Sequence, residues 1–283
     1  MKFYIVDAFT DSPFGGNPAG VVLLDRGTDF PSDEQMRLVA AELRYSETAF
    51  ARQDGATAFT TRYFTPTGEI DLCGHATIAT FGTMHHEGIV PDGTICHNHT
   101  LAGTLEVSVG DTVLMQMAQP VVSDVHVDVE RLHRIMAGDA TLQWPEWPVE
   151  IVSTGLPDIM MPVVSVDALH GLKPDMDALS ALSSELGVTG VHAFAIASDD
   201  YTAHVRNFGP LYGIPEESAT GTSNAALTHY LLRHRLINHG AMCRFLQGEA
   251  MGRPSVVCTR HTGDQRIDVG GSCRIIAKGH LTI

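Results

Sequence analysis

Two stretches decide the fold of this chain: Asp71-Leu72-Cys73-Gly74-His75-Ala76-Thr77 and Ser218-Ala219-Thr220-Gly221-Thr222-Ser223-Asn224-Ala225. Each joins a glycine to small polar residues and runs into an apolar stretch typical of a helix. Each also follows an aromatic-x-Pro element, Phe64-Thr65-Pro66 in one case and Phe208-Gly209-Pro210 in the other. A unit that occurs twice predicts a duplicated fold, in which each half presents a loop-to-helix junction. Because a helix start offers free N–H groups and a positive dipole end, both junctions are expected to bind one anion in a shared site.

The composition is that of a globular protein and excludes several classes of function. With 283 residues the chain is long enough for two domains with proper cores. It carries 33 Asp and Glu against 18 Lys and Arg, a formal charge of −15, and this acidity argues against binding to nucleic acid or an anionic membrane. Lysine occurs only at Lys2, Lys173 and Lys278, which disfavours Schiff-base catalysis.

Nothing in the sequence indicates export or a membrane span. The strand-like start lacks the long apolar core of a signal peptide, and no stretch approaches ~20 apolar residues. The five cysteines are an odd number without a CxxC pair, a pattern typical of reduced thiols. We therefore expect a cytoplasmic protein.

Hydrophobic periodicity predicts the same order in both halves: strands, a helix, strands, an uncharged helix, strands. The first outer helix is expected at 33–43 and the second at 176–186; the uncharged helices are expected at 76–86 and 222–233. An uncharged helix is usually buried on all sides, so each half is expected to be a curved mixed sheet around a central helix, an α+β fold. The predicted divisions are an N-terminal half at 1–118, joined by strands from 272–283, a connecting segment at 119–148 and a C-terminal half at 149–271.

Two residues of the first half are candidates for acid–base chemistry. Glu47 directly precedes an apolar strand-like run, and burial there is expected to raise its pKa towards that of a useful general base. His75 lies one residue past Gly74 at the expected helix start, where a histidine can transfer a proton or hold a substrate carboxylate.

Cys73 and the glutamates of the second junction are further candidates. The helix dipole is expected to activate Cys73 as a thiolate, but the corresponding residue of the second half is Thr220, which disfavours a two-cysteine racemase. Glu216 and Glu217 supply carboxylates from the second half. The segment 96–99 contains two histidines, yet it lacks a third residue at metal-ligand spacing and is interpreted as a polar loop.

The chain resembles the phenazine-biosynthesis PhzF-like family, which has the diaminopimelate epimerase fold. In the first half the resemblance rests on Asp7-Ala8-Phe9, Phe14-Gly15-Gly16-Asn17-Pro18-Ala19-Gly20-Val21, Ser46-Glu47-Thr48-Ala49-Phe50, Arg62-Tyr63-Phe64-Thr65-Pro66 and the first junction. In the second half it rests on Arg206-Asn207-Phe208, Gly213-Ile214-Pro215-Glu216-Glu217 with the second junction, Gln247-Gly248-Glu249, Gly252-Arg253-Pro254-Ser255 and Val269-Gly270-Gly271.

This resemblance implies two pseudo-symmetric halves, a site in the cleft between them, a homodimer, and catalysis without cofactor or metal. Glu47 matches the family glutamate that moves a proton, and Glu217 stands where the family commonly has a helper aspartate. It further implies substrate contacts from both halves, namely Asn17, Ser46, Cys73, Gly74, His75, Gly221 and Thr222.

Three functions are consistent with these residues. The first is a cofactor-independent isomerase that moves a proton on a small carboxylate-bearing metabolite by general acid–base catalysis, with Glu47, His75 and Glu217 as catalytic residues. The second is an amino-acid epimerase or racemase that depends on Cys73. The third is a non-catalytic protein that binds a small molecule in the same cleft.

Overall fold

The computed structural model describes residues 1–137, 146–263 and 266–282. Its internal contacts divide the chain into two compact units. The first consists of Met1–Gln116 and Gly270–Ile283, and the second of Met117–Val269. Among the described residues, no helix is both long and apolar enough to cross a membrane.

The first unit is built on a mixed sheet of strands in the order β18-β1-β2-β3-β4-β6-β7-β8. The pairs β2–β3 and β4–β6 are parallel and the others antiparallel, and the short β5 pairs with β4. The strands are β1 (Lys2–Ala8), β2 (Asn17–Leu24), β3 (Thr48–Gln53), β4 (Ala58–Thr65), β5 (Gly68–Ile70), β6 (Thr94–Thr100), β7 (Gly103–Val109), β8 (Val113–Gln116) and β18 (Cys273–His280).

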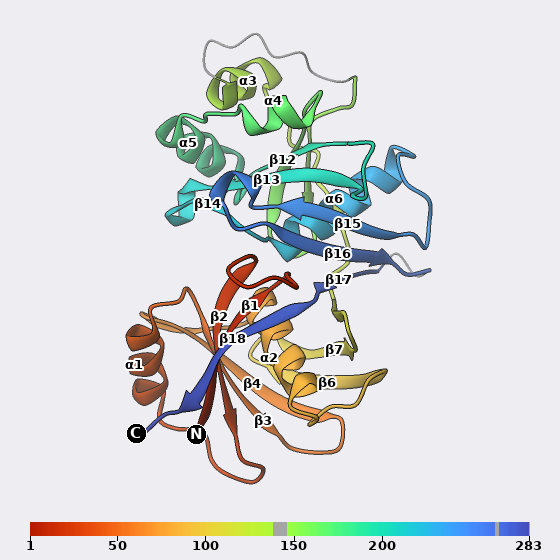
Figure 1. Ribbon diagram of the computed structural model, residues 1–283. Coiled ribbons are helices and arrows are strands. Elements are labelled where there is room, and N and C mark those ends of the chain that lie inside the picture. Colours follow the sequence, from red (N-terminus) through yellow and green to blue (C-terminus); the bar gives the residue numbers. More distant parts are fainter. Residues whose placement is uncertain (138–145, 264–265, 283) are drawn as a thin grey trace. The chain divides into compact units, whose positions relative to one another are not determined.

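Two helices of this unit differ in burial. Helix α2 (Gly74–His86) contacts β1, β2, β8 and β18, and its residues from His75 to Met84 are buried. Figure 1 shows it surrounded by the strands of its unit. An enclosed helix tolerates no unpaired charge, which explains its run of Ala, Thr, Ile and Phe. Helix α1 (Asp33–Leu43) packs on β3–β5 instead, and Ser32 and Gln35 form a capping box at its start.

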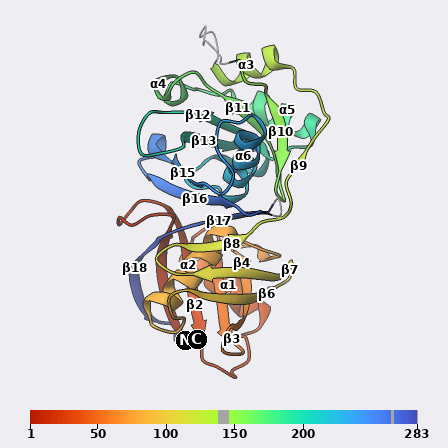
Figure 2. The same ribbon diagram turned by 90° about the vertical axis from the view of Figure 1, so that its right-hand side faces the viewer.

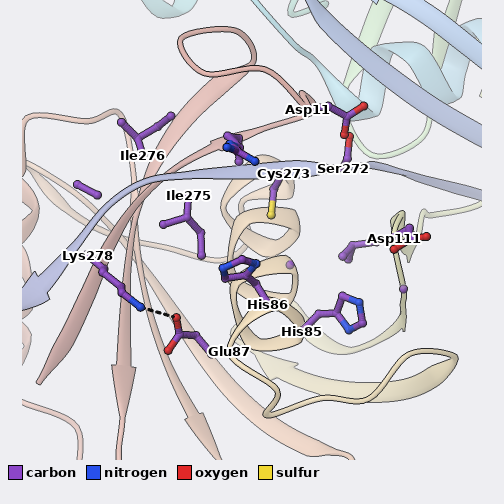
Figure 3. A pocket seen from close by; sticks show the side chains of 15 residues that line it. Asp11, His85, His86, Glu87, Asp111, Ser272, Cys273, Ile275, Ile276 and Lys278 are labelled. Carbon is purple, nitrogen blue, oxygen red and sulfur yellow. Dashed lines mark hydrogen bonds and ion pairs between the residues drawn. The ribbon is translucent and has the colours of Figure 1, made fainter.

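Strand β18 approaches the C-terminal part of α2 at a glycine. A Cβ atom on Gly82 would lie 2.2 Å from Sγ of Cys273, so a larger residue would force the Cys273 side chain to move. Figure 3 shows this sulfur pointing at the helix, beside a polar cavity of about 670 Å³. The cavity is lined by Gly82, His85 and His86 of α2, by Glu87 after it, by residues 272–278 and by Asp11, Gly110, Asp111 and Val113. It lies at the opposite end of α2 from the predicted site.

The second unit repeats this sheet with the order β9-β10-β11-β12-β13-β15-β16. Here β11–β12 and β13–β15 are the parallel pairs, and the short β14 pairs with β13. The strands are β9 (Val121–Val122), β10 (Glu150–Ser153), β11 (Pro157–Pro162), β12 (Gly190–Ala195), β13 (Ala203–Gly209), β14 (Ile214–Glu217), β15 (Met242–Gln247) and β16 (Ser255–His261), and β17 (Ile267–Gly271) follows them in sequence.

Helices cover both faces of the second sheet. On one face, α3 (Val129–Ala137), α4 (Val166–His170) and α5 (Met176–Leu186) pack on a core that includes Ala193, Ala195 and Phe208. On the other, α6 (Gly221–Arg233) packs against β10, β11 and β16, and its Tyr230 ring lies 5.4 Å from that of Phe194. Figure 2 shows α6 among its strands, with α3 and α4 outside them.

The two units therefore share one topology. In each unit an antiparallel hairpin is followed by a parallel pair of strands. A short strand then pairs with the next long strand, β5 with β4 and β14 with β13. A mostly buried helix follows the short strand: α2 follows β5, and α6 follows β14. This confirms the predicted α+β duplicated fold.

Two expectations differ from the structure. The segment 119–148, expected to connect the halves, contributes β9 and α3 to the second unit, because the face of α3 with Leu132, Ile135 and Met136 joins the core. The interpretation of 96–99 as a polar loop is wrong, because these residues lie within β6. Cys96 and Asn98 face inwards and the exposed His97 and His99 face outwards, a strand alternation that the polar composition concealed.

Candidate active site

Glu47 lies in the short loop between α1 and β3. Arg44 ends α1 in the left-handed conformation (φ 60°), and the carbonyl of Glu47 accepts a hydrogen bond from the Gly20 N–H at 3.2 Å. The loop is thus tied to β2 immediately before β3 begins. This attachment fixes the backbone from which the Glu47 side chain extends.

The start of α2 is the second component of the site. Cys73 is the N-cap residue, and no side chain caps the helix; the first helical bond runs from the Thr77 N–H to the Cys73 carbonyl at 3.0 Å. A Cβ atom on Gly74 would meet nothing within 4 Å. The space beside the first turn is therefore open, and its N–H groups, which have no acceptor within a helix, can approach an anion.

Three titratable side chains meet at this junction. Oε2 of Glu47 lies 3.2 Å from Nε2 of His75, and Sγ of Cys73 lies 3.4 Å from Nδ1 of the same ring. His75 is 8% exposed and Glu47 19% exposed. The ring of His75 thus lies between a carboxylate at Nε2 and a thiol whose Sγ is within 3.9 Å of both ring nitrogens.

The pKa values of the three groups depend on one another. Burial lowers the pKa of His75, but Cys73 and Glu47 together raise it well above its ordinary value. Burial raises the pKa of Glu47, yet His75, with help from Ser46 and Cys73, holds it below its usual value. Burial raises the pKa of the Cys73 thiol. These directions favour an ionised Glu47 paired with a protonated His75, and they disfavour the Cys73 thiolate.

These directions correct two expectations. The pKa of Glu47 is lowered and not raised, because the neighbouring imidazolium outweighs burial. Cys73 is not activated by the helix start, because its burial outweighs the effects of the dipole and His75. The three ligand atoms lie within 4.8 Å of one another, and a metal ion there would have to displace the proton that Cys73 and Glu47 stabilise on His75.

Two other predicted residues of the first unit lie in the Glu47 loop and at the start of β2. Ser46 is adjacent to Glu47 and contributes to its lowered pKa. Asn17 is buried at the start of β2, opposite Ala8. The turn before it depends on Gly16 (φ 64°), where a Cβ atom would lie 2.2 Å from the Ala8 carbonyl oxygen. The role of Asn17 as a substrate contact stays a prediction.

The second junction is held by amide and hydroxyl groups. Thr220 caps α6 without a side-chain bond to the helix, and its N–H donates to Oε1 of Gln247 at 3.1 Å. Nε2 of Gln247 donates to the Glu217 carbonyl at 2.8 Å. Gly221 begins α6, and the Thr222 carbonyl accepts from the Thr154 hydroxyl at 2.9 Å.

The two candidate glutamates of this junction have different environments. Glu216 forms a bidentate pair with Arg206 at 2.9 and 2.8 Å and is occupied structurally. Oε2 of Glu217 accepts a hydrogen bond from the Thr220 hydroxyl at 2.6 Å. Glu217 is thus the glutamate placed at the helix start, and its catalytic role stays a prediction.

Comparison with known proteins decides the family. Residues 6–279 match the model of the phenazine biosynthesis-like family, PhzC-PhzF. The chain belongs to this family. It is 33% identical over 300 residues to an uncharacterized isomerase of Clostridium acetobutylicum, covering all of this chain and 98% of the relative. It is 32% identical over 294 residues to the trans-2,3-dihydro-3-hydroxyanthranilate isomerase of Pseudomonas chlororaphis, covering 99% of each.

Solved structures agree with this assignment. A PhzF-family protein of Bacillus anthracis has a TM-score of 0.87 and 25% identity, with 100% of this chain and 99% of that one covered. A hydroxyproline epimerase of Agrobacterium vitis, at 13% identity, covers 99% of this chain and 90% of its own with a TM-score of 0.61, and so shares the fold. This PhzF-family chain is thus an isomerase with the epimerase-like fold.

Sequence reasoning missed the polar network beneath the second junction of this PhzF-family protein. The Ser223 hydroxyl donates to Oδ2 of Asp158 at 2.5 Å and accepts from Asn207 at 3.1 Å. Burial raises the pKa of Asp158 to about 6 and lowers that of His192, which also bonds Asn207, to about 3. Ser223 and Asn207 belong to matched motifs, but only the fold reveals Asp158 as their partner.

Proposed function

We propose that this protein moves a proton within a small, unsaturated, carboxylate-bearing metabolite, with Glu47 as the acid–base group. The observation that carries this proposal is the 3.2 Å contact between Glu47 and a buried His75. The contact keeps Glu47 ionised and ready to accept a proton. The relative from Pseudomonas chlororaphis, a trans-2,3-dihydro-3-hydroxyanthranilate isomerase, supports this substrate class.

The proton transfer can be written with these groups alone. Oε2 of Glu47 accepts a proton from a carbon next to the substrate's double bond, and the C–H electron pair delocalises over the conjugated system. Glu47 then returns the proton to the far end of that system, so one double bond shifts and the atoms balance. A single carboxylate suits transfer on one face, and acid–base catalysis of this kind contributes about 10²–10⁴-fold.

His75 stabilises the charges that this reaction creates. Its imidazolium is attracted to ionised Glu47 before transfer and to the delocalised anion afterwards. Cys73, as a neutral thiol against Nδ1, orients the ring. The open N–H groups at Gly74 are the proposed site for the substrate carboxylate, and we extend the same role to Gly221 and Thr222 at the start of α6.

The proposal is tested by proton exchange in heavy water. Purified protein is incubated with trans-2,3-dihydro-3-hydroxyanthranilate and with a panel of small unsaturated acids, and NMR follows both the double-bond shift and deuterium incorporation. We expect catalysed exchange in at least one substrate. A protein that binds members of the panel without exchanging any proton would overturn the proposal in favour of a binding function.

We further propose that the protein acts in the cytoplasm as a homodimer. The free cysteines of the described chain support a reducing compartment, and the family resemblance supports the dimer. Light scattering coupled to size-exclusion chromatography measures the mass directly, and a monomer of about 30.5 kDa would contradict this part.

A further inference from the structure

A cluster of two histidines and two carboxylates in the second unit lies outside the proposed chemistry. His170 ends α4, His204 lies in β13, and Glu249 begins the short 3₁₀ helix Glu249–Met251. Oε2 of Glu249 lies 2.7 Å from Nδ1 of His204 and 3.3 Å from Nε2 of His170. One carboxylate oxygen thus faces a nitrogen of each ring.

We propose that His170, His204 and Glu249 form a binding site for a divalent transition-metal ion of the zinc type. Their ligand atoms lie within 4.8 Å of one another. Ligands around a tetrahedral zinc ion at 2.0–2.2 Å are roughly 3.4 Å apart. The 3.3 Å distance from Oε2 of Glu249 to Nε2 of His170 already has this spacing. The 2.7 Å distance from Oε2 to Nδ1 of His204 must increase by less than about 1 Å.

The outer contacts of His204 are those of a metal ligand. Its second nitrogen, Nε2, lies 2.8 Å from Oδ2 of Asp199, and metal-binding histidines almost always bond a carboxylate or carbonyl through the nitrogen that faces away from the metal. The rings of Tyr201 and His170 pack against it at 5.7 and 6.4 Å. His204 is therefore held in one orientation, with Nδ1 towards Glu249.

The backbone that carries these ligands is also fixed. Arg206, two residues along β13 on the same face as His204, donates Nη1 to the carbonyls of Leu169, His170 and Leu172 and so holds the end of α4. Gly248 has a φ of 81°, and a Cβ atom there would lie 2.3 Å from the Arg253 carbonyl oxygen. The loop that presents Glu249 is consequently tight.

Exposure and ligand type define the ion. His204 is 8% exposed, whereas Glu249 is 29% and His170 39% exposed, so an ion can enter and keep water ligands on the open side. Two imidazoles with one carboxylate favour zinc, nickel or copper over magnesium and calcium, which prefer oxygen ligands.

A bound ion would stabilise the second junction. Gln247, two residues before Glu249, bonds the Thr220 N–H and the Glu217 carbonyl at the start of α6. Holding Glu249 in place would therefore hold Gln247 as well. This assigns the ion a structural role at the second junction, separate from the acid–base groups at the first.

Zinc titration of untagged, chelator-treated protein tests the proposal. Calorimetry is expected to show one Zn²⁺ per chain, and Zn²⁺ is expected to raise the melting temperature. His170→Ala and Glu249→Gln should each weaken binding by at least about tenfold, and Asp199→Asn by about 10–100-fold. A tenfold excess of Mg²⁺ should not compete.

Matched variants separate this site from zinc binding elsewhere on the chain. The double variant His97→Ala/His99→Ala removes the exposed histidine pair of β6 and should bind zinc normally. If the same contacts reflect only a protonated His204 bridging Asp199 and Glu249, wild type binds no zinc and His170→Ala changes nothing. That result, or a loss of binding confined to the His97/His99 variant, would overturn the proposal.

Discussion

The two loop-to-helix junctions have the same backbone design and different chemistry. Each follows a short strand, begins a mostly buried helix with glycine, and leaves the helix start without a side-chain cap. Around the first lie Glu47, Cys73 and His75, three titratable side chains whose pKa values depend on one another. Around the second, Gln247 and Thr220 form hydrogen bonds with defined donors and acceptors.

This difference indicates that the two halves of a duplicated fold have different roles, one in proton transfer and one in holding the geometry. A titratable cluster can change its protonation state during a reaction, but its members must adjust to one another. An amide such as that of Gln247 does not titrate, so it fixes geometry at every pH. We therefore expect changes at the first junction to affect the rate, and changes at the second to affect binding and stability.

The largest effect is expected for Glu47→Gln, compared directly with Glu217→Gln. The first removes the proposed acid–base group and should lower kcat by about 10²–10⁴-fold with substrate affinity retained. The second removes one acceptor of the Thr220 hydroxyl and should cost less than about tenfold. Steady-state kinetics and binding titrations measure both, and equal losses would show that the junctions do not divide the work in this way.

Gln247→Ala should mainly affect stability. Gln247 is fully buried, and its removal leaves the Thr220 N–H and the Asn224 amide without this acceptor. Each buried group left without a partner costs about 1–3 kcal/mol. Urea denaturation measures the loss, with Gln53→Ala on β3 as a control at a less buried position. Unchanged stability would show that the second junction is held by other contacts.

A smaller effect should appear in the pH dependence of stability. The raised pKa of His75 stabilises the fold below its unfolded value near 6.5, and this contribution disappears as pH rises through the folded value. The lowered pKa of Glu47 stabilises the fold above the unfolded value of 4.5. This contribution to stability disappears as pH falls through the folded value. The difference in free energy of unfolding between wild type and His75→Gln should therefore be largest between about pH 4.5 and 6.5.

Thermal unfolding at closely spaced pH values measures this window. The difference is expected to be about 1–3 kcal/mol, the cost of leaving a buried polar group without its partner. If the stability difference between wild type and His75→Gln does not vary with pH, the Glu47–His75 pair stabilises the fold by packing and not by charge.

The smallest effect is expected for Cys73→Ser. A neutral thiol that only orients His75 can be replaced by a hydroxyl with less than about tenfold loss of kcat. Iodoacetamide should react slowly, because burial raises the pKa of this thiol. Rapid inactivation by alkylation together with an inactive Cys73→Ser variant would instead support a cysteine-dependent epimerase.

Periodicity and glycine patterns predicted most of the fold because they report local preferences. The uncharged helices and the repeated junction follow directly from burial and from the aromatic-x-Pro elements. The partners of the site were less accessible: Glu47 and His75 were predicted separately, but their pairing depends on a strand order that the sequence does not state. The pKa of Glu47 was predicted in the wrong direction because it depends on that partner.

The second-unit polar groups show the same limit. Asp158 and Ser223 are 65 residues apart, and His170, His204 and Glu249 come from three separate elements. Spacing along the chain carries no signal for such groups. By contrast, the prediction of a loop at 96–99 failed on a local pattern. The exposed His97 and His99 alternate with the buried Cys96 and Asn98, which is the alternation of a strand.

The pairing of β18 with β1 has a consequence for folding. These strands run antiparallel from Lys2 opposite His280 to Ala8 opposite Cys273, so the first unit is completed by residues from both sides of the second. The second unit is one continuous segment of the chain, whereas the unit that carries Glu47 and His75 is built from two segments that are far apart in sequence. Bringing β18 back to β1 closes a very long loop, and this loop closure carries an entropy cost that the second unit does not bear.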